Sequence, residues 1–231
     1  MVDIVILSLV VDSDSFETTN NCVESYAKSN IVDKIYVIET NKKWSELGFK
    51  YNEKAIVVIP DEEFNYNRFL NIGKSHCKND FIVFSNNDLV VEDNCVENLY
   101  NKLIEDKDLM SVCPVDRNWH RHTKMYFNND NKLYTGYVSA LHMFGCCYML
   151  KKSVFDVIGD FDERFFFFYQ DDDLATTLKY HKQKHGVLTS ARIKHKISKK
   201  PQPDGGERFR YTDRNMYEQG EIYKKKWQGK L

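Results

Sequence analysis

The strongest constraint on the fold is a continuous apolar run close to the N-terminus. Residues 3–11 read DIVILSLVV, in which aliphatic side chains follow one another with almost no polar alternation. A run of this kind and length is typical of a strand buried on both faces of a parallel sheet. Turn and N-cap residues follow in Asp12–Ser15 and predict a helix that extends to about Ser29. The chain therefore opens with a strand, a capped turn and a helix.

The same unit recurs through the first hundred residues. The predicted elements are strands over 34–39, 55–59 and 81–84, and helices over 67–77 and 92–105. Strands that alternate with helices predict an α/β fold with a single, Rossmann-like, doubly wound mixed sheet flanked by helices.

Polar side chains fall where two of these strands end. Glu39 closes one strand, and Asp88 follows another together with Asn86 and Asn87. Ligands of doubly wound sheets bind at the C-terminal ends of strands, and carboxylate and amide oxygens can hold a divalent ion. An ordinary turn, in which the asparagines take left-handed or capping conformations, is the alternative interpretation of Asn86–Asp88.

The second half of the chain is less regular. Residues 116–135 are polar, dotted with aromatics and aperiodic, which predicts a long functional loop that selects the acceptor. His120 and His122 lie in it, but no third ligand accompanies them to complete a zinc site. The remaining predicted segments are a helix over 174–181, a short strand over 186–191, a turn-rich stretch over 201–210 and a terminal helix over 213–226.

An aromatic run, Phe165–Tyr169, leads almost directly into the three carboxylates of Asp171–Asp173. Adjacent ionised aspartates repel one another, and apolar neighbours disfavour their charged forms further. Carboxylates in such a setting are candidates for a general base. The alternative is structural, with Asp171 as the N-cap of the following helix and the other two in its first turn.

Length and composition limit the class of protein. The chain has 231 residues without a linker rich in Pro, Gly or Ser, and 42% of them are hydrophobic, so we expect a single domain over 1–231 with a sizeable core. Its six cysteines form no CxxC pair, and the N-terminus shows no signal segment or membrane-spanning run. These features predict a cytoplasmic protein, of a bacterium or of an infected host cell.

The net charge of −1 is unevenly distributed, because residues 1–100 have a formal net charge of −8 and residues 101–231 have one of +7. A basic half is expected to attract an anionic partner such as a diphosphate, an anionic lipid head group or nucleic acid. A solvated lysine-rich surface is the alternative interpretation.

Several segments, taken in order, resemble the GT-A-fold nucleotide-sugar glycosyltransferases of family 2, and most of all the catalytic domains of β-1,4-galactosyltransferases and chondroitin-polymerase-like enzymes. The resemblance covers roughly residues 3–210. The matching segments are Phe64–Gly73 (FNYNRFLNIG), Phe84–Leu89 (FSNNDL), Gly145, Gly159–Phe161, Gln170–Leu174 (QDDDL), Arg192–His195 (RIKH), Lys199–Lys200 and Arg208–Phe209.

The resemblance implies roles for individual residues. Asp171 matches the catalytic base, and Asp172 matches a carboxylate that holds sugar or acceptor hydroxyls. Asp88 and His195 match the ligands of Mn²⁺ or Mg²⁺. The residues implied in nucleotide or donor binding are Ser8, Glu39, Asp61, Asn65, Arg68, Asn87, Asp88, Gly145 and Gln170. Residues 1–105 would then bind the nucleotide sugar, and residues 106–231 would bind the acceptor and carry catalysis.

The chain also departs from the family pattern at several positions. Asn86 replaces the first aspartate of the metal-binding motif, and Gln170 replaces the glutamate before the base. Arg192 stands where the galactosyltransferases have a metal-binding methionine. Their Trp-Gly lid is replaced by Phe165–Tyr169, so galactose specificity is not implied.

The sequence therefore predicts a metal-dependent inverting glycosyltransferase that uses a nucleotide sugar, with UDP as the expected nucleotide. The expected acceptor is a saccharide or glycoconjugate, and a hydroxylated base in DNA, as in phage-type transferases, is the alternative. A nucleotidyltransferase is a rival of another class, but it would be expected to carry a basic glycine-rich loop where Val11–Asp14 is acidic. A non-catalytic sugar-binding module would not need both Asp88 and Asp171.

Overall fold

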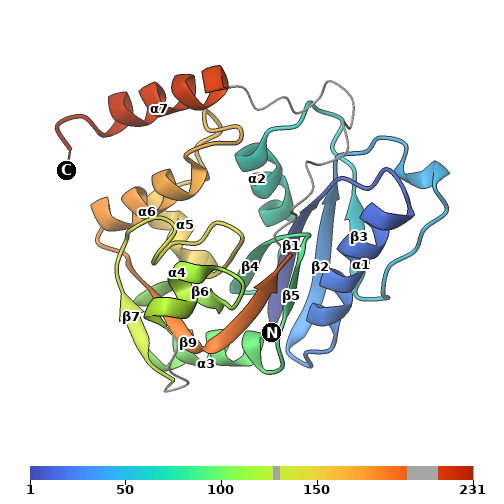
Figure 1. Cartoon of the computed structure of the whole chain (residues 1–231), viewed down its shortest axis with the longest axis horizontal. Helices are drawn as coiled ribbons and strands as arrows, with labels where there is room; N and C mark the ends of the chain where they lie inside the picture. Colours follow the sequence, from blue (N-terminus) through green and yellow to red (C-terminus); the bar gives the residue numbers. More distant parts are fainter. Residues whose placement is uncertain (127–130, 197–212, 231) are drawn as a thin grey trace.

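The computed structural model describes residues 1–126, 131–196 and 213–230. Its centre is a nine-stranded mixed sheet with strands from both halves of the chain. Four strands form a parallel half, and Figure 1 shows them side by side on the right of the molecule. They lie in the order β3 (Ala55–Val58), β2 (Val32–Glu39), β1 (Val2–Ser8) and β4 (Phe81–Asn86).

The other half of the sheet is mixed. Strand β8 joins β4 in antiparallel pairing, β6 and β9 are parallel to each other, and β5 and β7 both pair with β9 in antiparallel fashion. Their bounds are β5 (Leu89–Val91), β6 (Leu109–Asp116), β7 (Leu133–Thr135), β8 (Cys147–Lys151) and β9 (Lys184–His195).

Helices cover both faces, and the alternation of side chains along β1 assigns each helix to a face. Ile4 and Ile6 belong to one apolar core with side chains of α1 (Ser13–Ala27) and α3 (Cys95–Glu105). Val5 and Leu7 belong to a second core on the opposite face. That core contains side chains of α2 (Tyr66–His76) and α6 (Gln170–Tyr180). The uninterrupted apolar run is thus explained by burial on both faces.

The smaller elements are two 3₁₀ turns and three further helices. They are η1 (Trp44–Glu46), α4 (His120–Met125), η2 (Lys152–Val154), α5 (Phe155–Ile158) and α7 (Asp213–Trp227). Within the part of the chain that the structure describes, no helix combines the length and apolar character needed to cross a bilayer. All six cysteines are buried free thiols.

Several predictions of local structure need correction. The stretch 116–135 is not a continuous loop, because it contains α4 and β7, and its first residue ends β6. The strand predicted over 186–191 is twelve residues long, since it pairs with three other strands. Strands β5, β6, β7 and β8 were not predicted, while the turn-rich stretch 201–210 lies outside the described residues.

The start of α6 is a further correction. The helix begins at Gln170, and its N-cap is Tyr169 in the left-handed region with φ of 61°. Asp171 is therefore not the N-cap. All three aspartates lie in the first turn, where the positive end of the helix dipole stabilises negative charge.

The terminal helix α7 is anchored on the third of these aspartates. The buried Asp173 carboxylate accepts hydrogen bonds from Lys226 Nζ at 2.7 Å and from Trp227 Nε1 at 2.8 Å. Lys226 also forms an ion pair with Asp162 at 2.9 Å. Figure 1 shows α7 lying above α6, at the edge of the molecule.

Helix α7 also holds the aromatic run. The side-chain oxygen of Gln219 accepts hydrogen bonds from the backbone N–H groups of Phe167 and Phe168, at 3.2 and 3.1 Å. Tyr223 stacks on Tyr169 with ring centroids 5.5 Å apart. These contacts support the left-handed backbone of Tyr169, which is costly for a bulky residue outside such a setting.

We expect the substitution Lys226→Met to lower the free energy of unfolding by about 3 kcal/mol, because it leaves the buried Asp173 carboxylate without its cation. The measurement is equilibrium unfolding in urea. Lys224→Met is the matched control, since Lys224 on the same helix pairs with the exposed Glu221 and its substitution should not change the unfolding midpoint. Equal stability of the two variants would contradict the anchoring role of Lys226.

Candidate active site

The C-terminal ends of β1 and β2 bring two polar side chains together. Ser8 and Glu39 are register partners, and both are buried. Glu39 Oε1 accepts hydrogen bonds from the backbone N–H groups of Val10 at 3.2 Å and Asn41 at 2.7 Å. Its Oε2 has no hydrogen-bond partner among the described residues, and burial raises the pKa of this carboxyl above its usual value. This end of the sheet thus keeps an unused acceptor.

Asp88 and His195 converge from different parts of the chain. Asp88 follows β4, His195 ends β9, and His195 Nε2 lies 2.9 Å from Asp88 Oδ1. Burial by itself lowers the pKa of His195, but the hydrogen bond to Asp88 and the charges of Asp88 and Asp116 outweigh it and raise this pKa. The structure therefore brings together the two residues that the resemblance implied as metal ligands.

The residues at this point fit a divalent ion only in part. A carboxylate and an imidazole are suitable ligands for Mn²⁺, whereas Mg²⁺ prefers oxygen ligands alone. Among the described residues no group of three or more His, Cys, Asp or Glu side chains is placed to hold an ion. The neighbouring amides are engaged, because Asn86 Oδ1 accepts from the Tyr66 hydroxyl at 3.2 Å and Asn87 Nδ2 donates to Thr19 Oγ1 at 2.8 Å. An ion on Asp88 and His195 would take its further oxygen ligands from water or from the substrate.

Asp171 lies on the other side of the same region. Gly145 comes so close that a Cβ atom there would be 3.0 Å from the Asp171 Cβ, which explains the absence of a side chain at position 145. Burial and the charge of Asp172 raise the pKa of Asp171 to about 6. A carboxyl with such a pKa is ionised near neutral pH and is a stronger base than an ordinary aspartate.

Tyr66, from the first turn of α2, lies between the two sets of residues. Its hydroxyl donates to Asn86 Oδ1 at 3.2 Å and faces the carbonyl of Gly145 at 3.4 Å. Burial raises the pKa of this phenol, and the charges of Asp171 and Asp88 raise it further. This hydroxyl thus links Asn86, at the end of the strand that precedes Asp88, to Gly145, which packs against Asp171.

An open cleft of about 450 Å³ adjoins Asp171. The aromatic run and the start of α6 line it, together with one residue of α7. The lining residues are Phe167, Phe168, Tyr169, Gln170, Asp171, Asp172 and Met216. Aromatic faces beside carboxylates are suited to a sugar ring, whose C–H groups pack on the rings while its hydroxyls meet the carboxylates.

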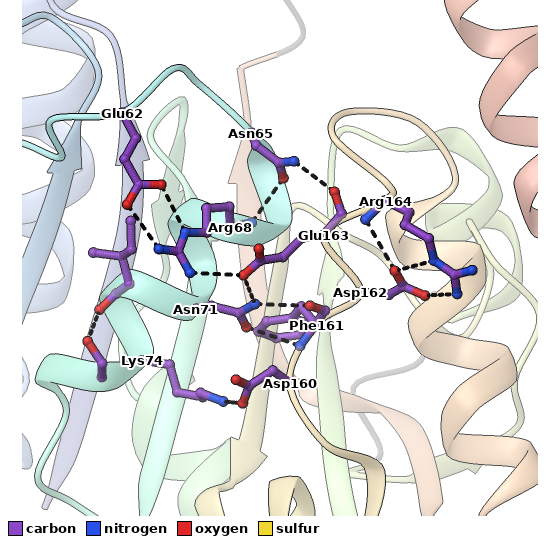
Figure 2. A network of polar contacts seen from close by, with 12 residues as sticks. Glu62, Asn65, Arg68, Asn71, Lys74, Asp160, Phe161, Asp162, Glu163 and Arg164 are labelled. Carbon is purple, nitrogen blue, oxygen red and sulfur yellow. Dashed lines mark hydrogen bonds and ion pairs between the residues drawn. The ribbon is translucent and has the colours of Figure 1, made fainter.

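The structure places Asn65 and Arg68 in a network that holds the loop before α6 (Figure 2). Asn65 caps α2 by accepting from the Arg68 N–H at 3.0 Å, and its amide donates to the Glu163 carbonyl at 2.7 Å. Arg68 donates to both carboxylate oxygens of Glu62 at 2.9 Å and to Glu163 at 3.3 Å. Their polar groups are therefore occupied by contacts within the protein.

Asn71, one turn further along α2, completes this network. Its side chain exchanges two hydrogen bonds with the backbone of Phe161, at 2.9 and 3.0 Å (Figure 2). Asp61, by contrast, is exposed and pairs with Lys42 at 3.0 Å. The asparagines of segment 64–73 thus position the chain that leads to Asp171.

Sequence reasoning missed Tyr66 and Asp116, which both adjoin the predicted site residues. Tyr66 stands inside the segment that carries the resemblance, but nothing in the local pattern shows that its hydroxyl points towards Asn86. Asp116 ends a strand that was not predicted. His122 is no zinc ligand, because its Nδ1 accepts from the Asp116 N–H at 3.1 Å and its Nε2 faces the Leu141 carbonyl at 3.1 Å.

A sequence model of the family described as "Glycosyl transferase family 2" matches residues 8–159. The fold is similar to that of the crystal structure of GalNAc-T7 with UDP, GalNAc and Mn²⁺, with a TM-score of 0.66, 13% identity, and coverage of 90% of this chain and 46% of that chain. It is also similar to the structure of the mannosyltransferase PcManGT from Pyrobaculum calidifontis in complex with GDP-Man and Mn²⁺. The TM-score is 0.61, the identity is 14%, and the match covers 86% of this chain and 57% of that chain.

The chain thus spans about half the length of these two structures. At such low identity the likeness concerns the fold, and it confirms the GT-A fold that the sequence predicts. A comparison with curated protein sequences finds no match.

We expect the side-chain carboxyl of Asp171 to titrate with an apparent pKa of about 6. Because the charge of Asp172 contributes to this value, Asp172→Asn should lower the pKa of Asp171. The measurement is a carbon-13 NMR titration of aspartate carboxyls, with Asp171→Asn identifying the resonance. A titration close to the ordinary value of 3.8, unchanged in Asp172→Asn, would contradict the assignment.

Proposed function

The chain belongs to glycosyl transferase family 2, and on that premise we propose that it transfers a sugar from a nucleotide-sugar donor to an acceptor hydroxyl with inversion at the anomeric carbon. The observation that carries the proposal is the contact of Asp88 with His195, joined through Asn86 and the Tyr66 hydroxyl to Gly145, which packs against Asp171. Such a displacement needs a base on the acceptor side and a cation on the leaving-group side.

The donor is proposed to lie at the C-terminal ends of β1, β2 and β4. Glu39 has an unused acceptor oxygen at this edge, suited to an N–H or O–H group of a nucleoside, and Ser8 is its register partner. Asp88 and His195 would hold Mn²⁺, which neutralises charge on the leaving diphosphate. Both solved structures of similar fold contain Mn²⁺ together with a nucleotide or nucleotide sugar, UDP in one and GDP-Man in the other. A UDP-sugar is the donor that we propose.

On the acceptor side, Asp171 would accept the proton of the attacking hydroxyl. Its raised pKa of about 6 leaves it largely ionised near neutral pH and poised to take that proton. Gly145 leaves room for the Asp171 side chain, and Asp172 borders the same cleft, where it can hold a sugar hydroxyl. One carboxylate acting as base, without a second as nucleophile, favours direct displacement and hence inversion.

Two substitutions relative to the family pattern have physical consequences. Asn86 can accept hydrogen bonds but carries no charge, and its oxygen is already bound by Tyr66, so Asp88 would be the only carboxylate ligand from this strand. Gln170 lines the cleft with a buried side-chain oxygen that has no partner among the described residues. This oxygen can accept a hydrogen bond from a substrate hydroxyl but cannot take its proton.

The acceptor that the cleft supports is a saccharide or glycoconjugate, because aromatic faces lie next to Asp171 and Asp172. Family membership makes a nucleotidyltransferase or a non-catalytic module the weaker interpretation. Transfer onto DNA would be recognised by activity that falls steeply as salt rises, because phosphate contacts release counterions. Activity on free saccharides that is insensitive to salt would exclude the DNA acceptor.

We expect purified protein with Mn²⁺ to cleave one of a panel of UDP-, dTDP- and GDP-sugars. Asp171→Asn should lower transfer about 10²–10⁴-fold while donor binding persists, since only the base is lost. Asp88→Ala should abolish the turnover that depends on Mn²⁺, because it removes a proposed ligand of the ion. The measurement is release of the nucleoside diphosphate, with proton NMR of the transferred sugar to show whether the anomeric configuration is inverted.

Asp33→Asn is the matched control, because Asp33 lies at the opposite end of β2 and should leave turnover unchanged. Wild-type rates in Asp171→Asn would exclude this residue as the base. Retention of the anomeric configuration would exclude direct displacement, and failure to bind any nucleotide sugar would overturn the proposed donor.

A further inference from the structure

A further carboxylate lies next to the proposed metal ligands Asp88 and His195. Neither the sequence pattern nor the proposed reaction explains its presence there. Asp116 is the last residue of β6 and is completely buried. Its Oδ1 accepts hydrogen bonds from the backbone N–H of Asn118 at 2.9 Å and of His195 at 3.2 Å. This oxygen therefore joins the end of β6 to the end of β9.

The second carboxylate oxygen of Asp116 is buried without a hydrogen bond from the described residues. This atom, Asp116 Oδ2, lies 3.9 Å from Nδ1 of His195. That separation is too long for a hydrogen bond, yet Nδ1 is the polar group in ion-pair range of this oxygen. An unsatisfied buried carboxylate oxygen is costly, so a function is expected for it.

The imidazole of His195 is thus placed between two carboxylates. Nε2 faces Asp88 at 2.9 Å, and Nδ1 faces Asp116. Phe144 lies with its ring perpendicular to the imidazole, with centroids 6.3 Å apart. Because the two nitrogens are on different sides of the ring, Asp88 and Asp116 cannot serve the same nitrogen.

This arrangement matters because a nitrogen that binds a metal must be free of its proton. If Nε2 binds the ion beside Asp88, the proton of the neutral ring resides on Nδ1 and needs an acceptor. Asp116 Oδ2 is the acceptor available there. Its partner oxygen is already fixed by two backbone N–H groups, which keeps the carboxylate behind the ring and not in the position of a third ligand.

We propose that Asp116 is a positioning residue that holds His195 in the Nδ1–H tautomer and thereby prepares Nε2 for binding of a divalent cation. This inference rests on the proposed metal site and deepens it by naming the residue that acts through His195. The hydrogen bond requires the present separation of 3.9 Å between Nδ1 and Oδ2 to shorten to about 3 Å when the ion binds. Partners of metal-bound histidines act in this way in general.

The test is the affinity for Mn²⁺ itself, measured by the electron paramagnetic resonance signal of the free ion during titration of the whole chain. Asp116→Asn keeps an oxygen for the two backbone N–H groups but presents an NH₂ group to Nδ1. That group donates, so it favours the proton on Nε2, where it blocks the metal. We expect affinity for Mn²⁺ to fall about 10–100-fold.

Asp3→Asn is the matched control. Asp3 is also a buried aspartate that accepts two backbone N–H bonds, from Lys78 and Asn79 at 2.8 and 2.9 Å, but it lies near the N-terminal end of β1. Its substitution should leave the affinity for Mn²⁺ unchanged. His195→Gln, which removes the proposed ligand, should weaken binding at least as much as Asp116→Asn.

The outcomes separate this inference from the proposed function. Wild-type affinity in Asp116→Asn, with loss of affinity in His195→Gln, would overturn the role of Asp116 alone. Absence of Mn²⁺ binding by the wild type would overturn the metal site and this inference together.

A second measurement needs no variant and therefore does not depend on the folding of Asp116→Asn. Nitrogen-15 NMR of the wild type with Zn²⁺, which is diamagnetic and accepts imidazole ligands, should show the His195 proton on Nδ1. A proton on Nε2 in the metal-bound protein would overturn the proposal.

Discussion

The location of the site depends on the parallel pairing of β1 with both of its neighbours. Alternate residues of β1 enter the cores on the two faces of the sheet, so the strand cannot slip by one residue without exposing one set. In this register Ser8 lies opposite Glu39 and Leu7 opposite Asn86. Parallel strands end at the same edge, and therefore the polar ends of β1, β2 and β4 form one surface whose position is fixed by apolar packing beneath it.

The second half of the chain reaches this edge by a different route. Strand β8 adds to β4 in antiparallel pairing, which brings the preceding Gly145 to the same end of the sheet. Successive residues of an α-helix are rotated by about 100°, so the adjacent aspartates at the start of α6 point in different directions. Asp171 faces the cleft, while Asp173 turns inwards and anchors α7 through Lys226 and Trp227. One acidic run thus serves both the site and the packing of the C-terminal helix.

The alternation of strands and helices, and with it the fold class, could be predicted because each unit has its own local pattern. The family resemblance in turn indicated Asp88, His195 and Asp171; the structure brings Asp88 and His195 into contact and packs Asp171 against Gly145. Strands β5 and β6 could not be predicted, since they owe their conformation to partners far along the chain. For the same reason no local pattern reveals Asp116 behind His195. Asn65 and Arg68 illustrate a different difficulty. A matched motif identifies these residues, but it does not reveal the contacts within the protein that already occupy their polar groups.

We propose that a cation bound by Asp88 and His195 lies on one side of the reacting sugar and that the base Asp171 lies on the other. The most direct measurement is a crystal structure of the protein with UDP and Mn²⁺, in which anomalous scattering locates the ion. We expect one manganese peak in contact with Asp88, His195 and the diphosphate, with the uridine at the ends of β1 and β2. A manganese peak away from these two side chains, or UDP bound elsewhere on the sheet, would contradict this proposal.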